Sequence, residues 1–194
     1  MFSFFNFLTY AVVTAVTPGP NNLMSMSIAR QSGFKQALPF NFGVFFGFSV
    51  VMLICTFFFT MLSSMLPMIK TPMVIIGALY MLFLAYKTYQ SSSEIKESLT
   101  KSSFVSGFLL QFINPKIYLY CLISMEVYIL PYFSHDFPML VFFSGVLSLI
   151  GFSFTLCWAF FGALLQTLFS KHARLTNTIL ALLLVYCAAS LFFE

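Results

Sequence analysis

Residues 36–69 read QALPFNFGVFFGFSVVMLICTFFFTMLSSMLPMI, and residues 137–170 form a second stretch that also lacks Asp, Glu, Lys and Arg. A membrane-spanning α-helix needs about 20 consecutive apolar residues. A membrane β-strand instead alternates apolar and polar residues over about ten positions. Both stretches are unbroken and exceed the length of one spanning helix. They therefore predict an all-α integral membrane protein.

The composition of the whole chain agrees with this class. Of 194 residues, 60% are hydrophobic and only 7% are charged, and the mean hydropathy is +0.97. A soluble domain carries roughly 25% charged residues. A soluble enzyme, a nucleic-acid-binding protein and a disordered chain are therefore excluded. At about 20 residues a span, the length allows roughly six or seven spans.

The few charges and polar clusters divide the chain into six predicted spans. The first segment lacks a basic start, so we expect it to stay as a helix and not to be a removable signal peptide. Several expected helix ends coincide with prolines, at which helices start or stop easily: Pro39, Pro67, Pro72, Pro131 and Pro138. The six spans lie near residues 4–28, 40–66, 72–89, 104–131, 138–166 and 175–193.

The basic residues gather on one side of this arrangement. In a six-span chain, the loops after spans one, three and five lie on the same face of the membrane. These loops hold seven of the nine basic residues, Arg30, Lys35, Lys87, Lys96, Lys101, Lys171 and Arg174, whereas the opposite face holds only Lys70. Basic loops stay in the cytoplasm. The sequence therefore predicts a bacterial inner-membrane protein with both termini in the periplasm.

The chain is expected to be one transporter domain of two similar halves. The first half covers about 1–90, a polar linker about 91–103, and the second half about 104–194. Three spans in each half force the second half to run opposite to the first, which makes a 3+3 inverted repeat, as in many secondary transporters. Pro18 and Pro115 occupy corresponding places, 97 positions apart, and predict broken helices in spans one and four.

The first predicted break contains Pro18, Gly19, Pro20, Asn21 and Asn22. Each proline removes a backbone donor and obstructs the preceding turn, and Gly19 tolerates an unwound backbone. The helix that begins after Pro20 would direct its unsatisfied N–H groups toward the break. This partly positive helix end suits a carboxylate. The two asparagines add amide donors and acceptors.

The second predicted break contains Asn114, Pro115 and Lys116. It offers the same features and adds a full positive charge. Lys116 could instead extend its amine to the membrane surface, but it lies about a dozen residues into its span, and cations at membrane depth are usually functional. We expect a substrate-binding site at the two breaks, with Tyr118 and Tyr120 as further lining residues.

Other residues leave alternatives open. Glu126 is the only acid within a predicted span and serves either proton coupling or a gate, or simply reaches the external surface. Gly43 and Gly47 form a G-x-x-x-G pair that packs the repeats together or forms a homodimer. The four cysteines contain no C-x-x-C pair, and the two histidines fall in loops on opposite faces, so we expect no catalytic residue, metal or cofactor.

The chain resembles the lysine exporter (LysE/RhtB) superfamily of amino-acid exporters. The resemblance rests on the run 17–22, on Asn114-Pro115-Lys116 and on the spacing of Gly33, Gly43 and Gly47, and it spans the whole chain. Residues 28–34, 51–55, 111–120, 157–159 and 180–188 look closest to the cysteine/O-acetylserine exporter branch. Many relatives carry an acid where Phe48 stands here, which favours neutral zwitterions over dibasic substrates.

The resemblance implies a six-helix carrier that exports small neutral amino acids, such as cysteine or O-acetylserine, from cytoplasm to periplasm, with proton exchange and alternating access. Homoserine, threonine or another amino acid is the nearest alternative substrate. A passive channel is less favoured, because a channel for charged solutes would show a ring of like charges. An intramembrane enzyme would need a nucleophile and a base in one span, and the sequence offers no such pair.

Overall fold

The computed structural model describes residues 2–90, 104–168 and 173–190, and these residues form helices joined by short turns. The described part contains no β-strand, in agreement with the all-α prediction. Most of the helices are strongly apolar, which is compatible with a membrane protein. The elements are α1 (Phe4–Val16), α2 (Pro20–Ser32), α3 (Phe34–Phe57), α4 (Phe59–Gln90), α5 (Phe104–Ile113), α6 (Pro115–Ile123), a π-helical turn η1 (Ser124–Ile129), α7 (Leu130–Phe133), α8 (Phe137–Leu168) and α9 (Ala173–Ser190).

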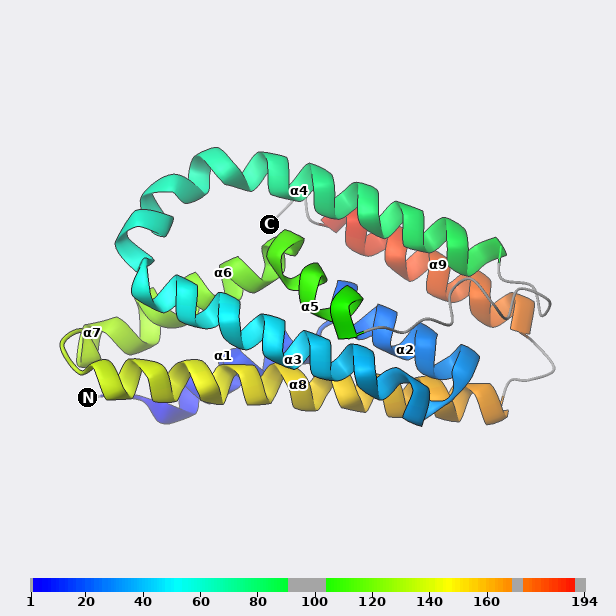
Figure 1. Cartoon of the computed structure of the whole chain (residues 1–194), viewed down its shortest axis with the longest axis horizontal. Helices are drawn as coiled ribbons and strands as arrows, with labels where there is room; N and C mark the ends of the chain where they lie inside the picture. Colours follow the sequence, from blue (N-terminus) through cyan, green and yellow to red (C-terminus); the bar gives the residue numbers. More distant parts are fainter. Residues whose placement is uncertain (1, 91–103, 169–172, 191–194) are drawn as a thin grey trace.

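The long helices α3 and α8 run side by side in opposite directions along the length of the molecule (Figure 1). The helix α2 packs along α8, and α5 packs along α3. The antiparallel pair α4 and α9 forms a separate layer on one side of this core (Figure 1). The residues before 91–103 and those after them therefore contribute one helix to each of these two pairs.

The exterior of the molecule differs from that of a soluble protein, because large apolar side chains cover much of it. Large apolar side chains such as Phe5, Leu79 and Phe160 are exposed, whereas Asn41 and Gln111 are fully buried. In water such an exterior would be unfavourable, but hydrocarbon accepts apolar surface and penalises unsatisfied polar groups. The arrangement fits a bundle surrounded by lipid.

The lengths of the individual helices differ from the six predicted spans. By length and composition, two described helices, α3 and 137–165 of α8, can cross a membrane. A third candidate arises if α5 and residues 115–133, which are bent by 63° from each other, count as one span. The helices α1 and α2 have 13 residues each, about 20 Å at 1.5 Å per residue, so neither crosses a bilayer alone.

The expected boundary between spans two and three is wrong. The sequence predicted that the helix would stop near Pro67 and Pro72, but the turn lies at Phe58 (φ −107°, ψ 26°), and α4 runs through both prolines. Pro39 likewise lies inside α3. An interior proline costs one backbone hydrogen bond and bends a helix, whereas ending a helix in lipid leaves several groups unsatisfied. Figure 1 shows the sharp bend near the start of α4.

The G-x-x-x-G pair packs the two halves of one chain together. A Cβ atom at Gly43 would lie 2.0 Å from the carbonyl oxygen of Phe104, and one at Gly47 would lie 2.6 Å from that of Phe108. From the other side, a Cβ at Gly107 would lie 2.2 Å from the carbonyl oxygen of Phe40. The three glycines therefore allow α3 and α5 to approach at backbone contact. In this structure the G-x-x-x-G pair serves packing within one chain, and the homodimer stays a prediction.

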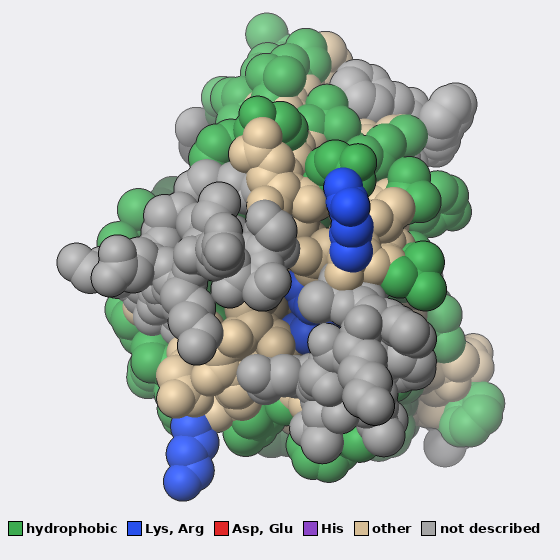
Figure 2. All heavy atoms as spheres, turned by 90° about the vertical axis from the view of Figure 1, so that its right-hand side faces the viewer, with side chains coloured by type: hydrophobic (Ala, Val, Ile, Leu, Met, Phe, Trp, Pro, Cys, Tyr) green, Lys and Arg blue, Asp and Glu red, His purple; other side chains and the backbone are tan. Residues whose placement is uncertain are grey.

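One end of the molecule is basic. This end, on the right of Figure 1, contains the end of α2 and the starts of α3 and α9, with Arg30, Lys35 and Arg174. Facing this end, Figure 2 shows Lys and Arg side chains and no acidic or histidine side chain among the described residues. Arg30 is buried, and its guanidinium donates to the side-chain oxygen of Asn177 on α9. The described acids, Glu126 and Asp136, belong to segments at the other end.

Candidate functional site

The first helix pair is interrupted between Val16 and Pro20. The helix α1 ends at Val16, and α2 begins at Pro20, with Gly19 as the residue before its first turn. Pro18 and Pro20 cannot donate backbone hydrogen bonds to a preceding turn, which explains the interruption. Gly19 is extended (φ −165°, ψ 175°), a conformation open to any residue. An added Cβ would lie 3.2 Å from Cδ and Nζ of Lys116, so the glycine leaves room for the lysine side chain.

The second interruption lies between Ile113 and Pro115. Asn114 precedes the first turn of α6, and its side-chain oxygen accepts a hydrogen bond from the backbone N–H of Lys116 at 3.2 Å. Pro115 occupies the first helical position, where its missing N–H costs nothing. The cap and the proline together start α6 at an angle to α5, which produces the bend of 63°.

The fold brings the two interruptions into direct contact. The Lys116 amine donates to the Thr17 hydroxyl at 2.6 Å and to the Thr17 carbonyl at 3.2 Å. The Asn114 amide nitrogen lies 3.5 Å from the side-chain oxygen of Asn21. Asn21 and Gln111 exchange a reciprocal pair of amide hydrogen bonds, at 2.8 and 3.1 Å. Residues about half a chain apart in sequence thus form one polar cluster.

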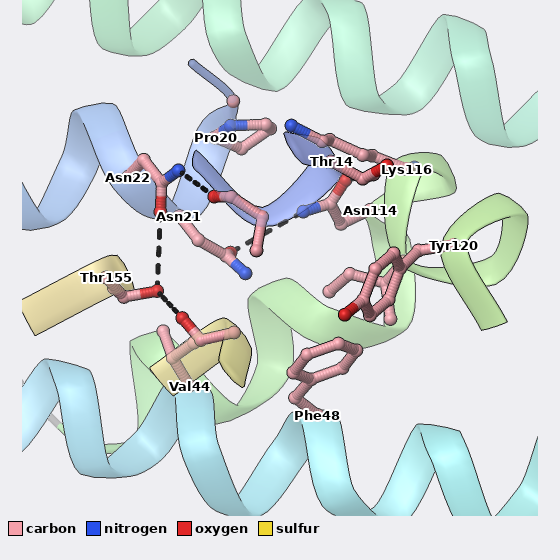
Figure 3. Close-up of a pocket in the computed structure, with 14 residues that line it drawn as sticks. Thr14, Pro20, Asn21, Asn22, Val44, Phe48, Asn114, Lys116, Tyr120 and Thr155 are labelled. Atoms are coloured by element: carbon pink, nitrogen blue, oxygen red, sulfur yellow. Dashed lines mark hydrogen bonds between the residues drawn. The ribbon is translucent and has the colours of Figure 1, made fainter. Parts of the chain in front are cut away.

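A cavity of about 50 Å³ lies beside this cluster (Figure 3). One water needs about 10–15 Å³ on this scale, so the cavity has the size of a small molecule of several heavy atoms. Five segments surround it: the end of α1, the start of α2, the middle of α3, the start of α6 and the middle of α8. The lining residues are Thr14, Ala15, Gly19, Pro20, Asn21, Asn22, Val44, Phe48, Asn114, Lys116, Ile117, Tyr120, Gly151 and Thr155.

Most of the residues expected at the site line this cavity: Gly19, Pro20, Asn21, Asn22, Asn114, Lys116 and Tyr120. The other expected residues lie outside the lining. Pro18 is exposed, and Pro115 is buried beside the cavity. Tyr118 differs from expectation, because its hydroxyl points back along the chain and donates to the Phe112 carbonyl at 3.2 Å. Glu126 is exposed on η1 and takes no part in the lining.

Sequence reasoning did not predict the part of the lining contributed by α1, α3 and α8. Thr14, Val44, Gly151 and Thr155 have no local motif, and Phe48 stood out only as a departure from an expected acid. Thr14 comes from the end of the short helix α1, and the others come from the middles of the long apolar helices α3 and α8. Only the packing of those helices around the interruptions places them at the cavity, so the sequence carries no separate signal for them.

The two asparagines of α2 have different roles. The Asn22 amide nitrogen donates to the carbonyls of Ala15 and Thr17, both at 2.9 Å, and so satisfies the free end of α1. Its oxygen accepts from the Thr155 hydroxyl at 3.4 Å, which ties the interruption to α8 (Figure 3). Asn22 therefore holds the interruption in shape. Asn21, which is half-buried and faces Gln111 and Asn114, is the better placed to contact a ligand.

The electrostatics of the cavity favour an anionic group at one wall. Among the described residues that line it, Lys116 carries the one charge, and none is Asp or Glu. The start of α2 also has no side-chain cap, so its first N–H groups and the positive end of the helix dipole face the same region. On the other side, Val44, Phe48, Ile117 and Tyr120 provide an apolar wall. Such a cavity can bind a small molecule with a carboxylate at one end and a compact neutral group at the other.

Comparison with protein families matches residues 12–194 to the family described as "LysE type translocator". Similar curated proteins include the "Cysteine/O-acetylserine efflux protein" of Escherichia coli O1:K1 / APEC, which is 38% identical over 188 residues, and that of Salmonella typhimurium strain LT2, which is 39% identical over 188 residues. Each alignment covers 96% of both proteins. No solved structure matches the chain. The chain therefore belongs to the LysE type translocator family.

Proposed function

We propose that this protein is a secondary active exporter of small neutral amino acids from the cytoplasm to the periplasm, with cysteine and O-acetylserine as the first substrates to test. The names of its relatives support this assignment, because cysteine/O-acetylserine efflux proteins align with 96% of the chain. The size of the cavity and its neutral apolar wall also suit a small zwitterion. Homoserine and threonine are the nearest alternatives.

The contact of Lys116 with Thr17 is the observation that carries the proposal. It places an amine, the uncapped start of α2 and two amides of the lining around one small volume. The carboxylate of an amino acid would bind Lys116 and the first N–H groups of α2, with Asn21 and Asn114 beside it. In a low-dielectric site a charge-assisted hydrogen bond of this kind is stronger than a neutral one.

We propose six spans in two inverted repeats. The first span would comprise α1 and α2, the fourth would comprise α5 and α6, and α3, α4, α8 and α9 would supply the others. The packing of α3 on α8 and of α4 on α9 supports the repeat, because each pair joins corresponding helices of the two halves. The basic end of the molecule would face the cytoplasm, which leaves both termini periplasmic.

Transport would alternate access by rearranging the halves about the cavity. At the basic end, α2 lies closely along α8, and α5 along α3, whereas the corresponding contacts of α6 with α3 and of α1 with α8 are less extensive. If the contacts of α2 with α8 and of α5 with α3 loosened while those of α1 with α8 and of α6 with α3 tightened, the basic end would open and the opposite end would close. Proton exchange, a coupling or gate role for Glu126 and a homodimer stay predictions that belong to this proposal.

Counterflow in proteoliposomes tests the function. Vesicles loaded with unlabelled amino acid should accumulate radiolabelled cysteine or O-acetylserine transiently, with saturation. A pH gradient should change net efflux if protons are exchanged. A passive channel would show no counterflow and would contradict a carrier. Counterflow limited to another amino acid would keep the carrier and change its substrate.

A further inference from the structure

The apolar wall of the cavity depends on a helix position that has no side chain. Phe48 on α3 is buried, and its ring centroid lies 5.8 Å from that of Tyr120. A Cβ atom at Gly151 on α8 would lie only 2.4 Å from Cε1 of the Phe48 ring and 3.0 Å from Cδ1. The ring therefore occupies the space that any side chain at position 151 would need.

This wall lies away from the positive group. Figure 3 shows Phe48 and Tyr120 on one side of the cavity, and Lys116, Thr14 and Pro20 on another. If an amino acid binds with its carboxylate at Lys116, as the proposed function requires, its side chain extends toward the ring of Phe48. The position of that ring then limits the length of side chain that fits.

We propose that Gly151 and Phe48 set the upper size limit of the transported amino acid. Phe48 contacts the substrate side chain, and Gly151 is a positioning residue that lets the ring lie back against α8. A normal carbon–carbon contact is about 3.5–4.0 Å, so a methyl group at position 151 would push the ring by roughly 1 Å. In a cavity of about 50 Å³, such a shift removes the room for the longest side chains first.

The substrate pair for the test differs in length but shares the zwitterionic head. Cysteine ends in a thiol, whereas O-acetylserine carries a longer acetyl ester. Counterflow of each would be measured in proteoliposomes, with a reductant present to keep cysteine in the thiol form. The readout is the ratio of the two rates, because a general loss of folded protein lowers both rates equally.

Gly151→Ala should lower the rate ratio of O-acetylserine to cysteine by about tenfold or more, the usual effect of a misfit of one methylene in an apolar pocket. Gly145→Ala is the matched control on the same helix, because a Cβ there meets nothing within 4 Å, and it should leave the ratio unchanged. Phe48→Ala should raise the ratio and admit leucine. The double variant should behave like Phe48→Ala, because the ring through which position 151 acts is gone.

Each outcome of these rate measurements supports or contradicts the proposed size limit. An unchanged ratio of the two rates in Gly151→Ala would overturn the size limit. So would a change in this ratio that Gly151→Ala causes equally in the unsubstituted protein and in the Phe48→Ala variant. If Gly151→Ala does not fold, the series Phe48→Leu and Phe48→Ala replaces it, and a constant ratio across this series would overturn the proposal. Absence of amino-acid counterflow in the unsubstituted protein would instead refute the proposed function.

Discussion

Lys116 and Thr17 are 99 positions apart in the sequence, yet the lysine amine donates to the threonine hydroxyl at 2.6 Å. Each residue belongs to an interruption between two helices, one in each half of the chain. The contact places the amine, which is the charged group among the described residues of the cavity lining, against the end of α1 and close to the start of α2. In the proposed mechanism, a substrate carboxylate would share this amine.

Removing the amine should strongly reduce transport. Lys116→Met keeps the length of the side chain but deletes the charge, and a hydrogen bond to a charged group contributes about 1.5–3 kcal/mol. We expect counterflow to fall by roughly 10- to 100-fold, while insertion into the membrane is retained. Lys35→Met, which replaces a lysine at the basic end, away from the cavity, is the control. Unaltered counterflow in Lys116→Met would show that the substrate binds elsewhere.

Crowding the lysine should weaken transport without removing it. The backbone of Gly19 is extended and accepts alanine, but the new Cβ would lie 3.2 Å from the Lys116 side chain. The amine must then shift by a few tenths of an ångström. We expect Gly19→Ala to raise the half-saturating concentration several-fold, measured by counterflow at a series of substrate concentrations. A variant with normal kinetics would mean that the amine can move freely.

Separating α3 from α5 should destabilise the fold. A methyl group at Gly43 would lie 2.0 Å from a backbone oxygen, which cannot move aside as a side chain can. Overpacking of this kind costs about 1–3 kcal/mol. Gly43→Ala should therefore lower the midpoint of thermal unfolding in detergent, whereas Gly145→Ala should not. Light scattering on the same samples distinguishes this effect from loss of a dimer, which would change the mass instead of the midpoint.

The predicted orientation can be measured with single cysteines in a variant whose four native cysteines are replaced. Ser3 and Lys35 are both exposed, and the starts of α1 and α3, beside which they lie, are at opposite ends of the molecule (Figure 1). An impermeant maleimide added to intact spheroplasts should label Ser3→Cys at once. It should label Lys35→Cys only after permeabilisation. The opposite pattern would place both termini in the cytoplasm.

The end of α1 at Val16 and the starts of α2 at Pro20 and of α6 at Pro115 have local causes in the sequence. Pro18, Pro20 and Pro115 lack the N–H that a continuous helix requires, and no distant contact restores it. The boundary expected at Pro67 and Pro72 was wrong because the effect of a proline there depends on its surroundings. In α4 the chain bends and continues as a helix, and the turn falls at Phe58, which carries no local signal.

The role of the small residues also depended on their partners. Gly43 and Gly47 indicated a close helix contact, but the identity of the facing helix was open between another repeat and another chain. Gly19 leaves space for Lys116, and Gly151 leaves space for Phe48. The sequence around either glycine does not predict these contacts. Each involves residues about a hundred positions apart, so neither can be derived from local spacing.

The sequence alone determined the features that depend on hydropathy, charge and backbone chemistry: a helical bundle for lipid, a basic end, and two proline-induced interruptions with polar residues. Those properties belong to each residue or its neighbours in the chain. Only the tertiary structure decided that the interruptions touch, that Asn22 ties α1 to α8 while Asn21 faces Gln111 and Asn114, and that α3 and α6 supply the apolar wall of the cavity. These are properties of pairs of residues, and helix packing alone sets the distances between them.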